Sequence, residues 1–356
     1  MAGMGKRVAF YTFGCRLNQA ETARFRKWYL GRGWEEVDWR DADRVVVNTC
    51  AITGKAEREV RGFLRRVKRE NPKAEVWALG CWVSKLKIDG KRGDVVRGLR
   101  LIDNEEKREM LREMGNEIVG VVKAGYEKAF VKIQDGCDNF CSFCIVPYVR
   151  GRSRSELVGD VVNQVKRLVG EGIEWVVLTG VDIAQYHDGE CDLMCLLDKI
   201  LTESEVKRLG LGSIYPTFGL NGGVEKMAKL FEKYGERLER RLHISLQSGS
   251  ESVLRRMGRK TTAAQFAEVV EELRRLVPGM VITTDVIVGF PGETKAEFEE
   301  SLAFVKKMKF DKLHVFRYSP REGTVAAKMV GCKGWEHVPE RVVKERARRM
   351  REVIEF

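Results

Sequence analysis

The chain has 356 residues, of which 44% are hydrophobic and 33% are charged, and its formal net charge is +12. This composition is typical of a globular protein with a buried core, and no apolar run is long enough for a membrane span or a signal peptide. We therefore expect a cytoplasmic protein with no membrane partner. The positive charge favours an anionic partner, with nucleic acid as the first candidate.

Strands and helices alternate in the first third of the chain. Apolar segments predict strands at 7–15, 44–50 and 75–81, and amphipathic segments predict helices at 18–33 and 54–70. Short connections between such elements indicate an open parallel sheet with right-handed crossovers. The charged stretch 86–125, with a predicted helix at 104–114, would close this N-terminal domain, to which we assign residues 1–120.

A second series of apolar segments follows. The predicted strands lie at 129–134, 175–180, 209–215, 241–247, 281–290 and 312–319, and the clearest helices at 156–171, 261–276 and 294–308. Six strand–helix units predict a partial (β/α)6 barrel over residues 121–330, since a full eight-unit barrel needs more chain. The fold class is therefore α/β, an open parallel-sheet domain followed by a partial barrel.

Residues 331–356 contain a basic helix that begins near Pro339. Its apolar stripe is expected to pack on the barrel: Val343, Ala347, Met350 and Ile354. Its basic residues are expected to face outward and contact RNA phosphates: Arg341, Lys344, Arg346, Arg348, Arg349 and Arg351.

Three of the nine cysteines crowd into the stretch GCDNFCSFC, residues 136–144: Cys137, Cys141 and Cys144. Structural zinc sites normally need four ligands from paired cysteine or histidine knuckles, and no second pair lies nearby. Three thiolates suit a [4Fe–4S] cluster that leaves one iron open for another ligand. The stretch also follows the first predicted barrel strand, at the end where barrel active sites form.

The spacing of these cysteines and the partial barrel resemble the radical S-adenosylmethionine superfamily. The resemblance implies that the open iron binds S-adenosylmethionine, which is cleaved to methionine and a 5′-deoxyadenosyl radical. LTGVD (178–182), SLQSGS (245–250) and VIVGFPGET (286–294) end barrel strands where this family binds the cofactor. The cofactor contacts implied are Thr179, Gly180, Asp182, Ser245, Gln247 and Gly289.

Three arginines follow the cysteine stretch directly: Arg150, Arg152 and Arg154. Arginine offers planar, bidentate donors, so we expect contacts to the cofactor carboxylate or to substrate phosphate, with Arg150 as the cofactor ligand. A solvated turn is the alternative.

A second cysteine set is predicted in the N-terminal domain. Cys15, Cys50 and Cys81 each follow an apolar strand. Neighbouring parallel strands lie about 4.8 Å apart, so these thiols could converge at the sheet edge where ligands bind. Three unrelated core cysteines are the alternative, but the repeated placement favours a second three-cysteine [4Fe–4S] cluster.

The remaining cysteines and two of the histidines give no clear indication of function. Cys191 and Cys195 lie four residues apart on a predicted helix and are expected to pack in its apolar face, and Cys332 is expected to be an idle loop thiol. His243 and His314 lie inside apolar strands, as core or cofactor-adjacent histidines.

Two three-cysteine sets in this order resemble the radical S-adenosylmethionine methylthiotransferases. GCRLNQAET (14–22) and HVFRYSPREGTVAAKM (314–329) resemble the branch that acts on N6-threonylcarbamoyladenosine 37 of tRNA. The resemblance implies transfer of a methylthio group to C2 of that adenosine, with the tRNA anticodon stem–loop, a reducing electron donor and a sulfur donor as partners. The family continues into an RNA-gripping TRAM domain, which we expect to be absent here.

Two alternatives remain open. Tyr215 stands where that branch carries glutamate, which favours methylthiolation of a ribosomal-protein side chain, and another tRNA adenosine is also possible. The other alternative is a non-enzymatic iron–sulfur sensor that binds nucleic acid, which would not need the ordered cofactor segments.

Overall fold

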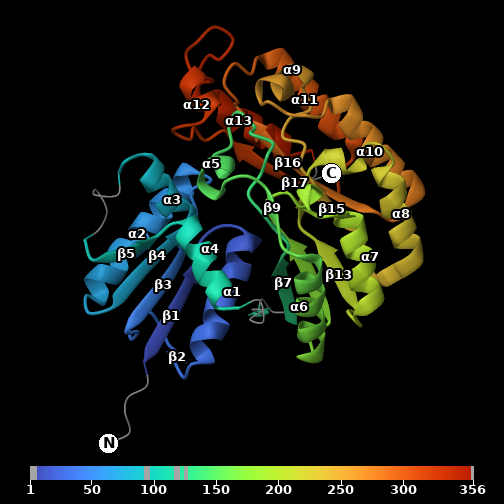
Figure 1. Ribbon diagram of the computed structural model, residues 1–356. Coiled ribbons are helices and arrows are strands. Elements are labelled where there is room, and N and C mark those ends of the chain that lie inside the picture. The colour runs from blue at the N-terminus through green and yellow to red at the C-terminus, as the bar shows by residue number, and fades with distance from the viewer. Residues whose placement is uncertain (1–5, 92–96, 116–120, 124–126, 354–356) are drawn as a thin grey trace, which may run out of the picture.

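The computed structural model describes residues 6–91, 97–115, 121–123 and 127–353 (Figure 1). An N-terminal α/β domain and a partial barrel stand beside each other, with helix α1 between the two sheets. Within the described residues, no helix combines the length and the apolar composition that crossing a membrane requires.

The N-terminal domain is a parallel five-stranded sheet in the order β2-β1-β3-β4-β5. Its strands are β1 (Arg7–Thr12), β2 (Glu35–Glu36), β3 (Arg44–Thr49), β4 (Glu75–Gly80) and β5 (Leu99–Ile102). Its helices are α1 (Arg16–Leu30), α2 (Gly54–Glu70), α3 (Cys81–Ile88) and α4 (Asn104–Glu113). The three central strands confirm the sequence prediction. The sequence analysis missed β2 and β5 because these short edge strands lack a continuous apolar run.

The barrel strands are β7 (Glu127–Lys132), β10 (Trp175–Thr179), β13 (Arg208–Leu211), β14 (Ser213–Ile214), β15 (Arg241–Ile244), β16 (Val281–Val288) and β17 (Lys312–Arg317). They form two sheets, β13-β10-β7-β6 and β14-β15-β16-β17, with β6 (Val121–Lys123) antiparallel at one edge. Gly212 divides one predicted strand into β13 and β14, which pair with β10 and β15 respectively. The barrel therefore has the six parallel strand positions that the sequence predicts.

Helices cover the outside of the barrel strands (Figure 1). They are α6 (Val158–Gly170), α7 (Leu193–Glu203), α8 (Gly223–Tyr234), α10 (Ala263–Leu276), α11 (Lys295–Met308) and α13 (Glu340–Arg351). The short helices α5 (Val146–Arg150), α9 (Glu251–Arg256) and α12 (Val325–Met329) lie at the upper end of the molecule in Figure 1, and α5 packs against α3. Single-turn helices are η2 (Ile183–Gln185), η3 (Pro216–Gly219) and η4 (Gly235–Arg237), and short strands are β8 (Gln134–Asp135), β9 (Arg154–Ser155), β11 (His187–Asp188) and β12 (Cys191–Asp192).

Helix α1 packs against β7 on the inner side of the barrel. Ala20 of α1 shares a small apolar cluster with Phe130 and Val177 of the barrel strands. The N-terminal domain therefore faces the barrel lumen, which brings Cys15, the residue before α1, to the lumen.

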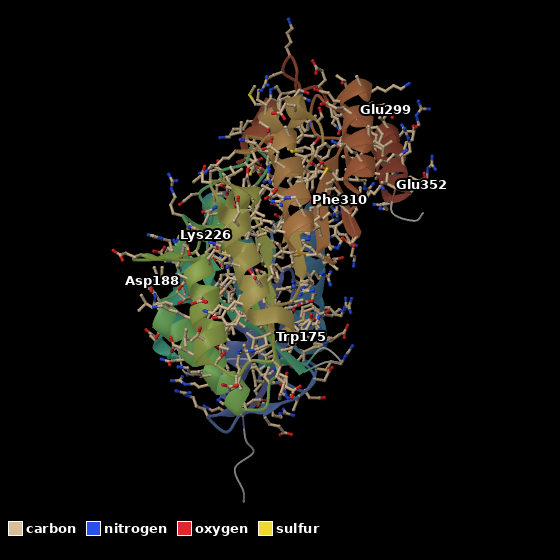
Figure 2. All side chains as sticks on the ribbon, turned by 90° about the vertical axis from the view of Figure 1, so that its right-hand side faces the viewer. Trp175, Asp188, Lys226, Glu299, Phe310 and Glu352 are labelled. Atoms are coloured by element: carbon tan, nitrogen blue, oxygen red, sulfur yellow. A yellow bond between two sulfur atoms is a disulfide. The ribbon has the colours of Figure 1, made fainter. Side chains whose placement is uncertain are left out.

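The basic helix α13 packs on β16 and β17 as the sixth barrel helix. Val343, Ala347 and Met350 are buried as predicted, and Ile354 lies outside the described residues. The prediction for Arg346 is wrong: its side chain is buried and its Nη1 donates to Glu293 Oε2 at 2.7 Å. Figure 2 shows Glu299 of α11 and Glu352 near this helix, and they accept hydrogen bonds from Arg349 and Arg348.

The prediction for Cys191 and Cys195 is also wrong. The side chain of Asp192 caps α7 by accepting from the Cys195 N–H at 2.9 Å, so the helix begins after Cys191. Cys191 instead lies in β12, with its Cα 5.2 Å from that of Cys195, and the two form a disulfide.

Candidate active site

A loop at residues 136–145, here called the cluster loop, connects β8 to α5. It carries the first cysteine set: Cys137, Cys141 and Cys144. Gly136 opens it with φ +73°, and a Cβ there would lie 2.0 Å from the carbonyl oxygen of Arg152. Only glycine therefore permits this close approach, which folds the loop over the C-terminal end of β7.

Two contacts hold the cluster loop from opposite sides. Asp182, which follows β10, accepts from Asn139 Nδ2 at 2.9 Å and from the Tyr215 N–H at 3.1 Å. On the other side, the Ser142 N–H donates to the carbonyl oxygen of Met257 at 2.8 Å. Burial raises the pKa of Asp182, and hydrogen-bond donors oppose that rise. The predicted cofactor contact Asp182 therefore joins the cluster loop, through Oδ2, to the segment after β14, through Oδ1.

The second cysteine set lies at the C-terminal ends of three neighbouring strands. Cys50 and Cys81 come directly after the paired residues Thr49 and Gly80 of β3 and β4. The chain just before Cys15 lies close to Cys50, since a Cβ placed on Gly14 would lie 3.0 Å from Cys50 Sγ. Burial, with smaller contributions from Cys81 and Cys15, raises the pKa of the Cys50 thiol to about 12.

Three side chains that the sequence analysis missed donate N–H groups to these sulfurs. They are Gln185 to Cys137 (3.3 Å), Arg259 to Cys141 (3.7 Å) and Asn104 to Cys81 (3.5 Å). Donors of this kind stabilise negative charge on metal-bound sulfur and tune iron–sulfur clusters. No sequence signal marks them, because each lies far along the chain from the cysteine it contacts.

The chemistry of both cysteine sets fits iron–sulfur clusters. Burial also raises the pKa of the Cys144 thiol to about 12, with Cys141 contributing. A metal displaces the protons of such thiols on binding, and its attraction for thiolate offsets the cost of burying the charge. Each set offers three sulfurs and N–H donors that complement them.

A buried charge network connects the two sets. Arg150 donates to Asp135 at 2.8 Å and to Glu21 at 3.2 Å, and Glu21 also accepts from Lys107 at 2.6 Å. Burial opposes ionisation of Glu21, but Arg150, Lys107 and Lys132 hold its pKa well below the usual range. Glu156, with Oε1 4.0 Å from Lys132 Nζ, adds a third carboxylate, so the three cations of the network face three carboxylates.

The structure places Arg150 differently from the sequence prediction. Its guanidinium is buried, and Asn18, Glu21 and Asp135 accept its hydrogen bonds. Its charge also acts on the Cys15 and Cys81 thiols. Arg150 thus serves the second cysteine set from within the protein rather than binding a cofactor carboxylate. Arg152 is exposed, with Nη1 3.4 Å from Asp138, and Arg154 donates to the Arg150 carbonyl at 2.6 Å.

A cavity of about 340 Å³, here called the lumen cavity, lies between α1 and the inner faces of the barrel strands. Cys15 lines it together with the predicted cofactor residues Thr179 and Gly180. A Cβ on Gly180 would lie 2.8 Å from Gln134 Oε1, which accepts the N–H groups of the next two residues. Gln134 therefore fixes the end of β10 and is a positioning residue that sequence analysis missed.

A second cavity, of about 200 Å³, adjoins the cluster loop. Cys144 and the predicted cofactor residue Gln247 line it, along with Ile52, two residues after Cys50. Asp285 lines both this cavity and the lumen cavity. One cysteine of each set therefore lines a cavity, and the two cavities share Asp285 as part of their walls.

The remaining two predicted cofactor residues, Ser245 and Gly289, contact other residues of the protein. The Ser245 hydroxyl contacts Arg259 Nη2 at 3.2 Å, so Arg259 connects it to the cluster loop. Gly289 has φ +72°, and a Cβ there would lie 2.5 Å from Val343 Cγ2 of α13. The close approach that requires this glycine is the packing of α13.

Two histidines share one carboxylate on the wall of the lumen cavity. Asp285 lies 3.1 Å from His243 Nε2 and 3.1 Å from His314 Nδ1. Their three ligand-type atoms lie within 4.8 Å of one another. The sequence placed both histidines near the cofactor or in the core, and the structure shows them half-buried and facing the lumen cavity.

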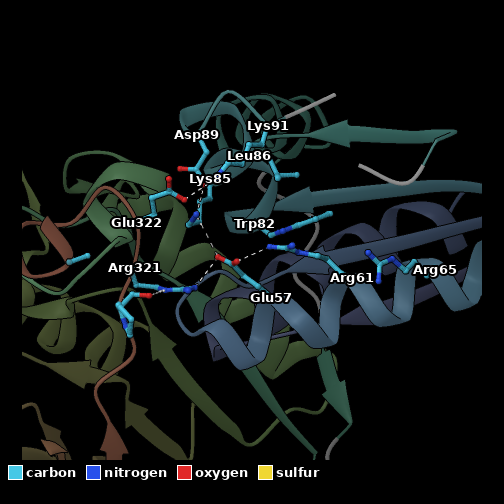
Figure 3. A pocket seen from close by; sticks show the side chains of 12 residues that line it. Glu57, Arg61, Arg65, Trp82, Lys85, Leu86, Asp89, Lys91, Arg321 and Glu322 are labelled. Carbon is cyan, nitrogen blue, oxygen red and sulfur yellow. Dashed lines mark hydrogen bonds and ion pairs between the residues drawn. The ribbon is translucent and has the colours of Figure 1, made fainter. Parts of the chain in front are cut away.

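A third cavity, of about 520 Å³, lies elsewhere, between α2, α3 and the segment around Arg321 (Figure 3). Its charged side chains pair with one another: Arg321 donates to Glu57 at 2.8 Å, and Lys91 to Glu322 at 2.9 Å. It contains no ligand-candidate cysteine. The ion pairs across this cavity connect the N-terminal domain to the barrel.

Residues 131–305 match the radical SAM superfamily, and residues 7–95 match the uncharacterized protein family UPF0004. The chain is 36% identical to the threonylcarbamoyladenosine tRNA methylthiotransferase MtaB of Bacillus subtilis, over 96% of this chain and 79% of the relative. It is 34% identical to the tRNA-2-methylthio-N(6)-dimethylallyladenosine synthase of Anoxybacillus flavithermus, over 99% of this chain and 70% of the relative.

The fold is similar to that of the radical S-adenosylmethionine methyltransferase TsrM from Kitasatospora setae, with a TM-score of 0.57 and 14% identity over 89% of this chain and 77% of that one. The protein is a radical SAM enzyme, and its cofactors are S-adenosylmethionine and [4Fe–4S] clusters. This overturns the alternative of a non-enzymatic sensor. The chain belongs to the radical SAM methylthiotransferase family and resembles its MtaB branch.

Proposed function

We propose that this enzyme converts N6-threonylcarbamoyladenosine 37 of tRNA to its 2-methylthio derivative. The observation that carries the proposal is the pair of neighbouring cavities, one lined by Cys144 and the other by Cys15, with Asp285 on both walls. A target C–H bond held there has one cysteine set on each side. The similarity to MtaB supports the choice of adenosine.

Each cysteine set is assigned one cluster. Cys137, Cys141 and Cys144 would hold the [4Fe–4S] cluster that binds S-adenosylmethionine, and Cys15, Cys50 and Cys81 would hold the second. When bound, these groups supply the radical that removes hydrogen from C2 and the sulfur and methyl group that replace it. The protein holds the three partners together and keeps water out, which makes the reaction effectively unimolecular.

The partners of this reaction follow from its chemistry. The tRNA anticodon stem–loop is the substrate, a reductant delivers electrons to the first cluster, and a sulfur donor renews the second. We expect the enzyme in the cytoplasm, where the proposed tRNA substrate is found.

Tyr215 no longer favours a ribosomal-protein substrate. Its hydroxyl accepts the Lys260 N–H at 2.8 Å, and its ring lies 4.0 Å from the guanidinium carbon of Arg259. Since Arg259 donates to Cys141, Tyr215 supports the cluster loop, which is a role that does not depend on the substrate.

The test is anaerobic reconstitution of the parent and of two triple alanine variants, one for each cysteine set. The parent is expected to bind about eight irons and each variant about four. The variant of Cys137, Cys141 and Cys144 loses reductive cleavage of S-adenosylmethionine. The variant of Cys15, Cys50 and Cys81 keeps cleavage but forms no methylthio product.

The substrate is decided by mass spectrometry of three stem–loops that carry threonylcarbamoyladenosine, dimethylallyladenosine or adenosine at position 37. Product from the first alone supports the proposal. Product only from the dimethylallyl RNA would assign the enzyme to the other tRNA branch.

A further inference from the structure

The lumen cavity contains three cationic side chains that form no ion pair with a carboxylate of the described residues. They are Arg16 of α1, Lys128 of β7 and Arg241 of β15. Lys128 Nζ lies 4.9 Å from the centre of the Trp175 ring and 5.7 Å from that of Phe130, and Arg16 lies 5.8 Å from that of Phe130. Aromatic faces compensate a cation only partly, so the charges remain available to a ligand.

The two carboxylates of the cavity both have other partners. Glu239 accepts from Arg208 at 2.7 Å, and Asp285 contacts His243 and His314. Burial lowers the pKa of Arg16, the charge of Arg241 lowers it further, and the charge of Glu239 partly offsets both effects. Like charges around one cavity repel unless an anion lies between them.

The cavity is long enough to connect these cations with the reaction site. Its wall on β10 runs from Thr179, at the Cys15 end, to Trp175, and four residues of strand span about 13 Å. A purine whose C2 lies near Cys15 can therefore direct a substituent toward the cations. The histidine pair on Asp285 lies on the same wall and offers polar contacts along the way.

We propose that Arg16, Lys128 and Arg241 bind a carboxylate on the N6 substituent of the substrate base, and that this contact selects a threonylcarbamoyl group over an apolar one. The inference rests on the proposed function and names the residues that choose its substrate. Arginine suits a carboxylate because its planar donors match both oxygens. A dimethylallyl group brings no charge to offset the repulsion between the cations.

The test uses the reconstituted enzyme and two stem–loops, one carrying threonylcarbamoyladenosine and one carrying the same nucleoside with its carboxylate converted to a primary amide. Fluorescence anisotropy measures binding, and mass spectrometry measures methylthiolation. The variants are Arg241→Gln and Lys128→Met. The control is Arg240→Gln, which removes the same charge one residue earlier, outside the lumen cavity.

The parent and Arg240→Gln are expected to bind the carboxylate RNA about 10- to 100-fold more tightly than the amide RNA. Arg241→Gln and Lys128→Met each lose most of that preference, while iron content and cleavage of S-adenosylmethionine without RNA show that they fold. Equal binding of both RNAs by the parent would overturn the inference. So would equal weakening of both RNAs in Arg241→Gln, which would mean contact with backbone phosphate.

The same experiment separates this inference from the proposed function. If the parent prefers the carboxylate RNA but methylthiolates neither RNA, the carboxylate site stands and the proposed reaction fails. If the parent methylthiolates both RNAs alike and binds them alike, the reaction stands and the carboxylate site fails.

Discussion

Single side chains far from the cysteines decide how the cluster loop is held. Arg256 accepts a hydrogen bond from the Ser142 hydroxyl at its carbonyl oxygen, at 2.8 Å, and its guanidinium binds Glu297 at 2.8 and 2.9 Å. Glu297 also completes the capping box of α11 with Thr294. One carboxylate therefore connects the start of a barrel helix to the loop between Cys141 and Cys144.

This carboxylate predicts a pH dependence. Although burial opposes ionisation, hydrogen bonds from Arg256, Ser252 and the Thr294 N–H lower the pKa of Glu297 from 4.5 to about 2. The folded state thus binds this proton less readily than the unfolded chain, so the stabilisation is present above pH 4.5 and is lost as the pH falls toward 2.

Glu297→Gln is expected to lower the Tm of the apoprotein at pH 6, and the difference from the parent should shrink steadily between pH 4.5 and 2. Calorimetry across that range measures it, with Glu271→Gln at the exposed Glu271 as the control. A Tm difference that stays constant down to pH 2 would contradict the prediction.

At the scale of elements, the contact between β16 and α13 depends on Gly289. Its φ of +72° is a conformation that side chains rarely adopt, and its missing Cβ leaves the space that Val343 fills. Its N–H donates to Glu293 Oε2 at 2.7 Å, and Glu293 also accepts from Arg346 of α13. The turn after β16 therefore fixes the last barrel helix by packing and by charge.

Gly289→Ala is expected to lower the free energy of unfolding by about 2–4 kcal/mol, through overpacking against Val343 and backbone strain. Urea denaturation measures the loss. The double variant Gly289→Ala, Val343→Ala should recover part of it, because the smaller side chain relieves the clash but not the strain. If the two substitutions instead destabilise additively, the contact between them is not the cause.

At the scale of the whole molecule, the net charge of +12 favours an anionic partner such as RNA. Arg341, Lys344, Arg348 and Arg351 of α13 are exposed, but Lys344 and Arg348 pair with Glu340 and Glu352. Arg346 is buried, and Arg349 is paired with Glu299. The helix therefore offers fewer free cations than its sequence suggests. We expect these side chains to contact phosphate groups of the proposed tRNA without regard to base.

The double variant Arg341→Gln, Arg351→Gln is expected to weaken binding of the carboxylate and amide stem–loops equally. Each lost phosphate contact should flatten the slope of log affinity against log salt by about one. Anisotropy titrations at several salt concentrations measure the slopes, with Lys226→Gln, Lys229→Gln on α8 as the control of equal charge. Identical slopes for the two double variants would show that α13 makes no RNA contact.

The sequence alone determined the features that depend on local spacing. The cysteines at 137, 141 and 144 lie within one short loop, and Cys15, Cys50 and Cys81 each follow a strand, so strand–helix periodicity was enough to group them. The six barrel strand positions followed from the same periodicity, because an apolar run and its turn residues are encoded locally.

Only the tertiary structure decided which distant side chains meet. Arg150 reaches Glu21 across 129 residues of sequence, which places its charge in the buried network instead of at a ligand. Gly289 faces Val343, and Arg16 shares a cavity with Arg241, although no local pattern relates these residues. The physical reason is that burial and charge pairing are set by how the N-terminal domain and α13 pack on the barrel, and that packing is a property of the whole chain.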